Sequence, residues 1–181
     1  MTRPRCSAFL AMSVDGFIAR PDGRLDWLDA VQAPGEDYGY AVFFAAVDTV
    51  VVGRSTWRVV LGFETWPYSG KKVVVLTHRP EVAIHGELLL AGAPEEVVAR
   101  LERDGARHLY VDGGAVVSQF LAAGLLDDLT ISVVPAVLGQ GVRLFQGALP
   151  ERALRLESSR DFPSGLVQLR YAAGDLRRPP G

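Results

Sequence analysis

Two short runs of β-branched residues constrain the fold of this chain more than any other feature. Residues 49–52 are Thr-Val-Val-Val and residues 72–76 are Lys-Val-Val-Val-Leu, without the alternation of polar and apolar residues that a half-exposed strand shows. Such runs are typical of strands that are covered on both faces, which occur almost only in parallel sheets with helices on either side. We therefore predict an α/β fold with both runs near the centre of the sheet.

Segments of strand and helix character alternate along the rest of the chain, as this architecture requires. Helical periodicity is clear at residues 94–103, where Pro94 opens the segment and apolar residues follow at helical spacing. The other predicted strands are residues 7–12, 108–111 and 128–134, the other predicted helices are residues 37–47 and 115–123, and residues 154–162 and 166–172 are predicted to form an antiparallel hairpin. Together these elements predict a three-layer fold whose central sheet is mixed, mostly parallel and flanked by helices.

Length and composition fit one globular domain. The chain has 181 residues, of which 49% are hydrophobic and 22% charged, so we expect a single domain over residues 1–181 with an ordered core over about residues 6–172. The 19 Lys and Arg residues and 21 Asp and Glu residues give a net charge of −2, which does not indicate a nucleic-acid partner.

Cys6 is the only cysteine, which excludes an intramolecular disulfide and a cysteine-based metal cage. No segment reads as a signal peptide or a membrane span, so we expect a cytoplasmic protein.

The sequence Val111-Asp112-Gly113-Gly114-Ala115-Val116 places two glycines between the end of an apolar strand and the start of a helix. Glycine removes the Cβ that would block a ligand, and the free N–H groups at the N-terminus of a helix favour an anion. The same order of strand, two glycines and helix also occurs as a plain tight turn. Both interpretations stay open at this point.

Two further segments with anion-binding character follow the predicted central strands. Gly53-Arg54-Ser55-Thr56 comes after the first β-branched run, and Thr77-His78-Arg79 comes after the second. In open α/β sheets ligands collect outside the carboxyl ends of the strands, so three such segments predict a ligand that carries several phosphates. The alternative is that each arginine is a solvated surface charge. Because the sequence contains no metal-binding or nucleophile motif, catalysis would depend on a bound cofactor.

Six motifs occur in an order that resembles the dihydrofolate-reductase-like proteins, in particular the group similar to the C-terminal reductase domain of the bifunctional riboflavin-biosynthesis deaminase-reductase. The resemblance runs from about residue 7 to residue 171. Its motifs are Ser13-Val14-Asp15-Gly16-Phe17-Ile18-Ala19, Asp26-Trp27-Leu28, Asp37-Tyr38-Gly39-Tyr40, residues 48–57, Val111-Asp112-Gly113-Gly114 and residues 135–141. The resemblance implies a sheet of about eight strands with NADPH across their carboxyl ends, and it leaves room for a homodimer. Since no zinc signature of a deaminase domain is present, we expect a stand-alone reductase-like domain.

The resemblance also implies which residues contact the cofactor. Ala11 and Ile18 resemble residues around the nicotinamide, and residues 53–56 resemble the segment that cradles the pyrophosphate and reaches the 2′-phosphate. Residues 77–79 match the segment around the adenosine ribose, and residues 14–27 are similar to the mobile loop that closes over nicotinamide and substrate. The predicted cofactor-binding residues are therefore Ala11, Ile18, Gly53, Arg54, Ser55, Thr56, Thr77, His78, Arg79, Val111, Gly113, Gly114, Ala115 and Val116.

The substrate side of the predicted site is less constrained. Asp37 has roughly the spacing of the acidic residue that folate reductases aim at the pterin, so we predict it as the catalytic acid, with an acid at a helix N-terminus as the alternative. The predicted substrate-binding residues are Asp15, Trp27, Tyr38 and Trp57, and the alternative for the aromatic ones is a place in the core. No metal is predicted. The sequence thus predicts an NADPH-dependent reductase of a small pterin-, folate- or riboflavin-precursor-like C=N or C=O group. The alternative is a dinucleotide-binding module of the same fold without turnover.

Overall fold

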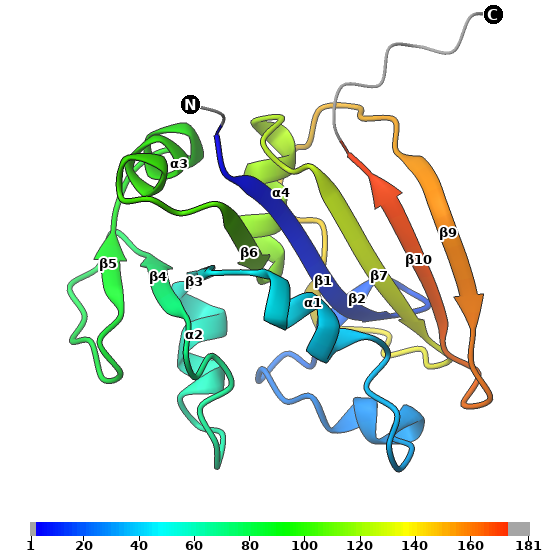
Figure 1. Cartoon of the computed structure of the whole chain (residues 1–181). Helices are drawn as coiled ribbons and strands as arrows, with labels where there is room; N and C mark the ends of the chain where they lie inside the picture. Colours follow the sequence, from blue (N-terminus) through cyan, green and yellow to red (C-terminus); the bar gives the residue numbers. More distant parts are fainter. Residues whose placement is uncertain (1–2, 174–181) are drawn as a thin grey trace, which may run out of the picture.

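The chain folds around one eight-stranded sheet with the strand order β5-β4-β3-β6-β1-β7-β10-β9 (Figure 1). This computed structural model describes residues 3–173, so the outermost residues of the predicted domain lie outside it. The strands of the sheet are β1 Arg5–Ser13, β3 Thr49–Gly53, β4 Lys72–Leu76, β5 Leu88–Leu90, β6 His108–Asp112, β7 Asp128–Val134, β9 Arg155–Asp161 and β10 Val167–Ala172. A separate two-stranded sheet pairs β2 Phe17–Ala19 with β8 Val142–Arg143.

Six neighbouring strands of the large sheet run parallel, and β10 and β9 close one edge as an antiparallel hairpin. The two β-branched runs form β3 and β4, which lie side by side with Val51 opposite Val74. Both of these valines are fully buried, because side chains cover each face of the sheet. The structure confirms the predicted fold class, a mixed, mostly parallel sheet flanked by helices with a C-terminal hairpin.

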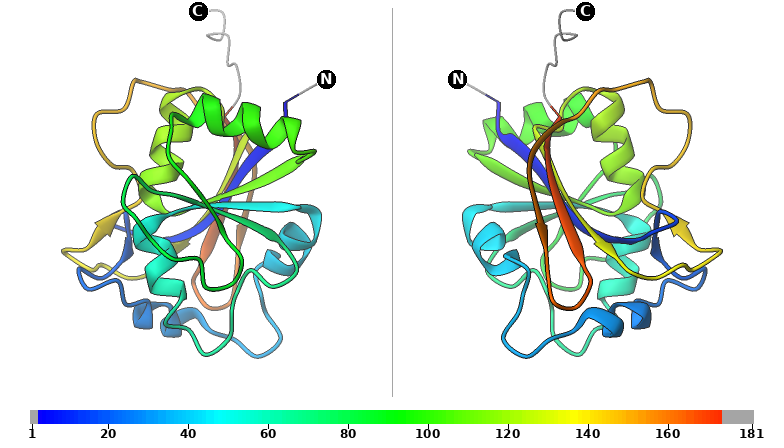
Figure 2. Two further views of the ribbon diagram at one scale, coloured as in Figure 1. Left: turned by 90° about the vertical axis from the view of Figure 1, so that its left-hand side faces the viewer. Right: turned by 90° about the vertical axis from the view of Figure 1, so that its right-hand side faces the viewer.

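Helices lie on both sides of the sheet, with α4 and α1 on opposite sides (Figure 2). The helices are the 3₁₀ helix η1 Asp26–Val31 and the α-helices α1 Tyr40–Ala46, α2 Arg54–Val60, α3 Pro94–Arg103 and α4 Gly114–Ala122. Successive residues of β3 point to opposite sides. Val51 packs in the core formed with α3 and α4, whereas Val50 and Val52 pack in the core formed with α1 and α2. None of the helices between residues 3 and 173 has the length and apolarity needed to cross a membrane.

The helix predicted at residues 37–47 is shorter in the structure and begins at Tyr40. Tyr38 has a φ of +57° and Gly39 a φ of +82°, both in the left-handed region, so the chain cannot be helical through these two residues. Two elements of the structure, α2 and β5, were not among the helices and strands predicted from the sequence. Helix α2 matters for the site, because it follows β3 directly and its first residues lie at the carboxyl edge of the sheet.

Candidate functional site

Two adjoining cavities open at the carboxyl ends of the central parallel strands. The larger one has a volume of about 630 Å³ and is lined mainly by aromatic and aliphatic side chains, so we call it the apolar cavity. The smaller one has a volume of about 410 Å³ and lies over the turn between β6 and α4, so we call it the glycine-turn cavity. Both cavities are lined by Ser55, Thr56, Gly113 and Val142. The two cavities therefore adjoin along these residues, at the start of α2 and the end of β6.

The two glycines between β6 and α4 are required for different reasons. Gly113 has a φ of +91°, and a Cβ at this position would overlap the hydroxyl oxygen of Thr56. Gly114 begins α4, and a Cβ there would lie 2.5 Å from the carbonyl oxygen of Arg143 and 2.8 Å from that of Leu144. Close packing therefore explains both glycines. The turn is a tight structural turn that also lines the cavity, so the two interpretations of the sequence are compatible.

Arg54 contributes a positive charge to the lining of the glycine-turn cavity. Its guanidinium bonds to the carboxylate of Glu81, which also accepts two hydrogen bonds from Arg58 at 2.8 and 3.0 Å. These hydrogen bonds from Arg58 and Arg54 lower the pKa of Glu81 below its ordinary value, so the carboxylate is ionised. One carboxylate balances one of the two guanidinium groups. The edge of the cavity thus keeps a net positive charge next to Arg54.

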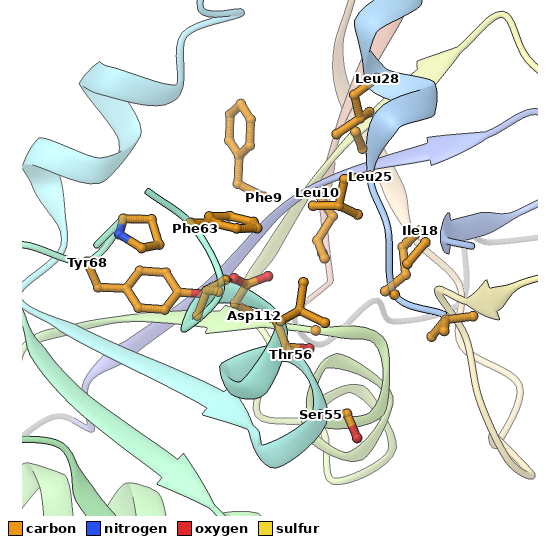
Figure 3. Close-up of a pocket in the computed structure, with 18 of the residues that line it drawn as sticks. Phe9, Leu10, Ile18, Leu25, Leu28, Ser55, Thr56, Phe63, Tyr68 and Asp112 are labelled. Carbon is orange, nitrogen blue, oxygen red and sulfur yellow. The ribbon is translucent and has the colours of Figure 1, made fainter. Parts of the chain in front are cut away.

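Asp112 is the last residue of β6 and points its carboxyl group into the apolar cavity, beside Tyr68 (Figure 3). The hydroxyl of Tyr68 donates a hydrogen bond to Oδ2 of Asp112 at 2.6 Å. Burial raises the pKa of Asp112 above its ordinary value, although hydrogen bonds from Tyr68 and the N–H of Gly113 act in the opposite direction. A carboxyl group with a raised pKa holds its proton up to a higher pH than an exposed one, which suits a group that acts as an acid.

Apolar groups surround Asp112 from several elements of the fold. Figure 3 shows Tyr68 and Phe63 on one side of the apolar cavity and Ile18, Leu25 and Leu28 on the other. Two further tyrosines, Tyr40 and Tyr110, complete the lining near Asp112. Burial and the charge of Asp112 raise the pKa of Tyr40 to about 12, so this phenol is neutral. A planar ring would contact apolar side chains here on most of its surface.

Asp112 and Tyr68 are not among the residues predicted for the site. The signal that identifies Asp112 is the alternation along β6. Leu109 and Val111 face the core with α3 and α4, whereas Tyr110 and Asp112 face the side on which the apolar cavity lies. No comparable signal marks Tyr68, which lies in the segment between α2 and β4.

Most of the predicted cofactor-binding residues line one of the two cavities. Ala11 and Ile18 line the apolar cavity. The glycine-turn cavity is lined by Gly53, Arg54, Ser55, Thr56, Thr77, His78, Gly113, Gly114, Ala115 and Val116. Val111 and Arg79 depart from the prediction that they contact the cofactor, because neither lines a cavity. The side chain of Val111 is fully buried in the core, and Arg79 is exposed. Contact of the other residues with a cofactor stays a prediction.

Asp37 lies outside both cavities, and this position corrects its predicted catalytic role. Its carboxylate accepts hydrogen bonds from the N–H of Ala41 at 2.8 Å and from the N–H of Gly39 at 2.9 Å. These bonds lower the pKa of Asp37 and stabilise the first turn of α1. The geometry supports the alternative interpretation, an acid at a helix N-terminus.

Asp15 also makes structural contacts and lines neither cavity. It accepts hydrogen bonds from the hydroxyl of Ser13 at 2.6 Å, from the N–H of Leu138 at 3.1 Å and from the N–H of Gly139 at 2.7 Å. The bond from Ser13 is the main cause that lowers the pKa of Asp15 to about 2. Asp15 therefore connects the segment after β1 to the loop after β7, which corrects its predicted role in substrate binding.

The three aromatic residues predicted to bind substrate belong to the interior and line neither cavity. Trp57 is 2% exposed, and its indole N–H donates a hydrogen bond to Oε1 of Glu87 at 2.7 Å. Trp27, which is 5% exposed, and Tyr38 pack in a third core that contains Phe162. The structure thus places Trp27 and Trp57 in the core, as their alternative interpretation expects, and Tyr38 partly buried against the third core.

Comparison with known proteins identifies the family. Residues 4–168 match the family described as the RibD C-terminal domain. The chain belongs to this family. The uncharacterized protein YwjB of Bacillus subtilis (strain 168) is 37% identical over 167 residues, which cover 90% of this chain and 94% of that protein. A crystal structure from Shewanella sp. PV-4, of a protein named for riboflavin biosynthesis, is 34% identical with a TM-score of 0.88 and covers 94% of this chain and 99% of that chain.

The fold of this chain is similar to that of a dihydrofolate reductase. The enzyme from Enterococcus faecalis, solved in complex with NADP(H), has a TM-score of 0.65 and 19% identity to this chain, and the match covers 94% of this chain and 97% of that chain. At this identity the likeness concerns the fold alone. The resemblance expected from the six sequence motifs is confirmed, and the chain has the family and the fold of a reductase.

Proposed function

We propose that this RibD-family chain is an NADPH-dependent reductase of a C=N or C=O group in a small heterocyclic compound. The observation that carries the proposal is the junction of two different cavities. One offers a positive charge and a glycine turn, and the other offers the carboxyl group of Asp112 among apolar side chains. When bound, NADPH supplies the hydride. The reductase-like family and the fold of an NADP(H)-binding enzyme support the same function.

The glycine-turn cavity has the groups that the phosphates of a dinucleotide require. Helix α4 begins at Gly114, so the free N–H groups of its first turn lie at the cavity and favour an anion. Ser55 and Thr56 add two hydroxyl groups on the shared wall. We assign Arg54 and Thr77 to the 2′-phosphate, because a guanidinium and a hydroxyl are good partners of a phosphate.

Asp112 takes the place of Asp37 as the residue that holds a proton for the reduced group. Its carboxyl group lies in the cavity that we assign to the reacting ring, and the bond from Tyr68 fixes its orientation. When the carbon of a C=N group gains the hydride, the nitrogen gains the proton of Asp112, and water then returns a proton to the carboxylate. The raised pKa keeps more of this carboxyl group protonated than an exposed aspartate would be.

The segment between β2 and η1 forms one side of the apolar cavity. Pro21, Gly23 and Leu25 line the cavity from this side. A Cβ on Gly23 would lie 2.9 Å from a methyl group of Val59, so the segment packs closely against α2. A wall of this kind excludes water from a reacting group and strengthens the electrostatic interactions around it.

Titration of the protein with NADPH and with NADH tests the proposal. Because a hydrogen bond to a charged group contributes about 1.5–3 kcal/mol, we expect NADPH to bind roughly tenfold or more tightly than NADH. Arg54→Ala should remove most of this preference. Arg103→Ala is the matched control: Arg103 is exposed at the end of α3 and lines neither cavity, so the preference should persist. Equal affinities for the two cofactors would contradict the assignment of NADPH. Tight NADPH binding without oxidation by any pterin or pyrimidine would favour the module without turnover.

A further inference from the structure

The charges of the apolar cavity all have one sign. Among the described residues that line it, the charged side chains are Asp22 and Asp112, and no lysine, arginine or histidine is present. Asp22 lies at the rim, whereas the carboxyl group of Asp112 is buried. The rest of the lining is mainly aromatic and aliphatic. A ligand in this cavity therefore meets carboxyl groups and apolar surface, without a cation to balance a negative charge.

The nearby cations already have partners and do not line the cavity, and one of them, Arg24, balances the charge of Asp22 at the rim, so Asp112 carries the unpaired carboxyl group among the described residues of the lining. Arg24 donates a hydrogen bond to Asp22 at 2.7 Å, and Arg20 donates one to Asp26 at 2.7 Å. The ammonium group of Lys71 lies over an aromatic ring and donates to a backbone carbonyl. None of these three side chains is free to neutralise an anion inside the cavity without losing its present partner.

Groups that suit an anion are concentrated at the other end of the cleft. Ser55 and Thr56 lie on the wall shared with the glycine-turn cavity, and Arg54 lies beyond it. An anionic substituent in the apolar cavity would have to give up water without gaining a cation, and it would face the carboxyl group of Asp112. Burial of an anion under these conditions is unfavourable, whereas burial of a neutral ring is favourable.

We infer that the apolar cavity takes a planar, largely apolar ring system that is neutral or positively charged, with a hydrogen-bonding edge toward Asp112, and that it rejects substrates that place a phosphate or carboxylate inside it. This inference rests on the proposed function for the statement that the bound ring is the substrate. The volume of about 630 Å³ leaves room for such a ring next to a nicotinamide. A ring N–H or amidine edge would form a charge-assisted hydrogen bond with an ionised Asp112, and a ring nitrogen or carbonyl would accept one from the protonated form.

Three quinolines of the same ring size test the inference by calorimetric titration at neutral pH. The probes are 2-aminoquinoline, quinoline and quinoline-2-carboxylate, which differ in the charge and hydrogen-bonding capacity of one edge. We expect 2-aminoquinoline to bind most tightly and at least tenfold more tightly than the carboxylate. Asp112→Asn should reduce this ratio to threefold or less. Asp26→Asn removes an equal charge from a residue that does not line the cavity, so it should leave the ratio unchanged.

The titrations are run on the protein alone and on the protein saturated with NADP⁺. If the protein binds neither NADPH nor NADP⁺, the proposed function fails. The quinoline titrations of the protein alone still measure the charge preference of the apolar cavity in that case. If Asp112→Asn does not fold, the order of the three probes on the unmodified protein decides. Binding of the carboxylate as tight as that of the amine, no binding of any probe, or a ratio that survives Asp112→Asn would overturn the inference.

Discussion

Replacing Gly114 by alanine tests whether this glycine is required by helix packing. A Cβ at this position would lie 2.5 Å from the carbonyl oxygen of Arg143, 2.7 Å from Nε2 of Gln146 and 2.8 Å from the carbonyl oxygen of Leu144. Both carbonyl groups are engaged: Gln146 donates to Arg143 at 2.9 Å, and Ser118 donates to Leu144 at 3.3 Å. The added carbon therefore points at the segment after β8 and meets atoms that are held in place.

Two opposing effects set the magnitude. Alanine restricts the unfolded chain more than glycine does, which stabilises the folded state by about 0.4–1 kcal/mol where the backbone allows it. Forcing an additional carbon into a packed site costs about 1–3 kcal/mol. Because two of the three nearest atoms belong to the backbone, we expect the cost to exceed the gain and the free energy of unfolding to fall by about 1–2 kcal/mol. For a chain of this length that corresponds to a decrease in Tm of about 2–8 °C.

Thermal unfolding followed by circular dichroism measures this change. Gly62→Ala is the control, because Gly62 is exposed, has no positive φ, and a Cβ there would meet its nearest atom, a backbone carbonyl of Val59, at 3.3 Å. Its Tm should stay within about 2 °C of the unmodified protein. Adding Gln146→Ala to Gly114→Ala removes the flexible neighbour and leaves both carbonyl groups, so it should not restore the Tm. A Tm of Gly114→Ala equal to that of the unmodified protein, or full rescue by Gln146→Ala, would refute the packing argument.

Two further predictions concern buried polar contacts. Because burial raises the pKa of Asp112, the stability linked to its protonated form is fully present below the pKa of the unfolded chain, about 3.9, and is lost as the pH rises through the higher native value. Asp112→Asn lacks this loss, so the difference between its Tm and that of the unmodified protein should increase as the pH rises above about 4, and a constant difference would contradict the argument. Trp57→Phe removes the donor to Glu87 and should cost about 1–3 kcal/mol in urea unfolding. A double-mutant cycle with Glu87→Ala, which removes the acceptor, isolates the bond, and a coupling energy near zero would show that packing alone explains the loss.

The fold could be predicted because its strongest signals are local. Runs of β-branched residues identify β3 and β4, and helical spacing identifies α3 with the bounds that the structure shows. The position of β1 between β6 and β7 carries no such signal, because strand order depends on contacts between distant segments. The start of α1 was placed too early for a local reason, since Tyr38 adopts a positive φ that its residue type does not favour.

Most of the residues predicted to contact a cofactor line one of the two cavities, whereas the residues predicted to bind substrate line neither. Glycines and an arginine at strand ends indicate anion binding by their type and position alone. The residue type of an aspartate or a tryptophan does not indicate whether it belongs to a binding site, because the same type occurs at helix termini, in the core and in cavities. Asp37 and Asp112 illustrate this: one accepts bonds from exposed backbone N–H groups, and the other is buried next to Tyr68. Burial, which the sequence does not show, distinguishes their chemistry.

The end of β6 connects the two halves of the proposed reaction. Asp112 ends the strand and directs its carboxyl group into the apolar cavity, and the next residue, Gly113, lines both cavities and leads into α4. A proton donor and the anion-binding turn are therefore placed by one rigid strand, which fixes their separation without help from a flexible loop. Because the carboxyl group and the turn face different cavities, substitution of Asp112 should act on the bound ring, and substitution of Arg54 on the far wall should act on the phosphates.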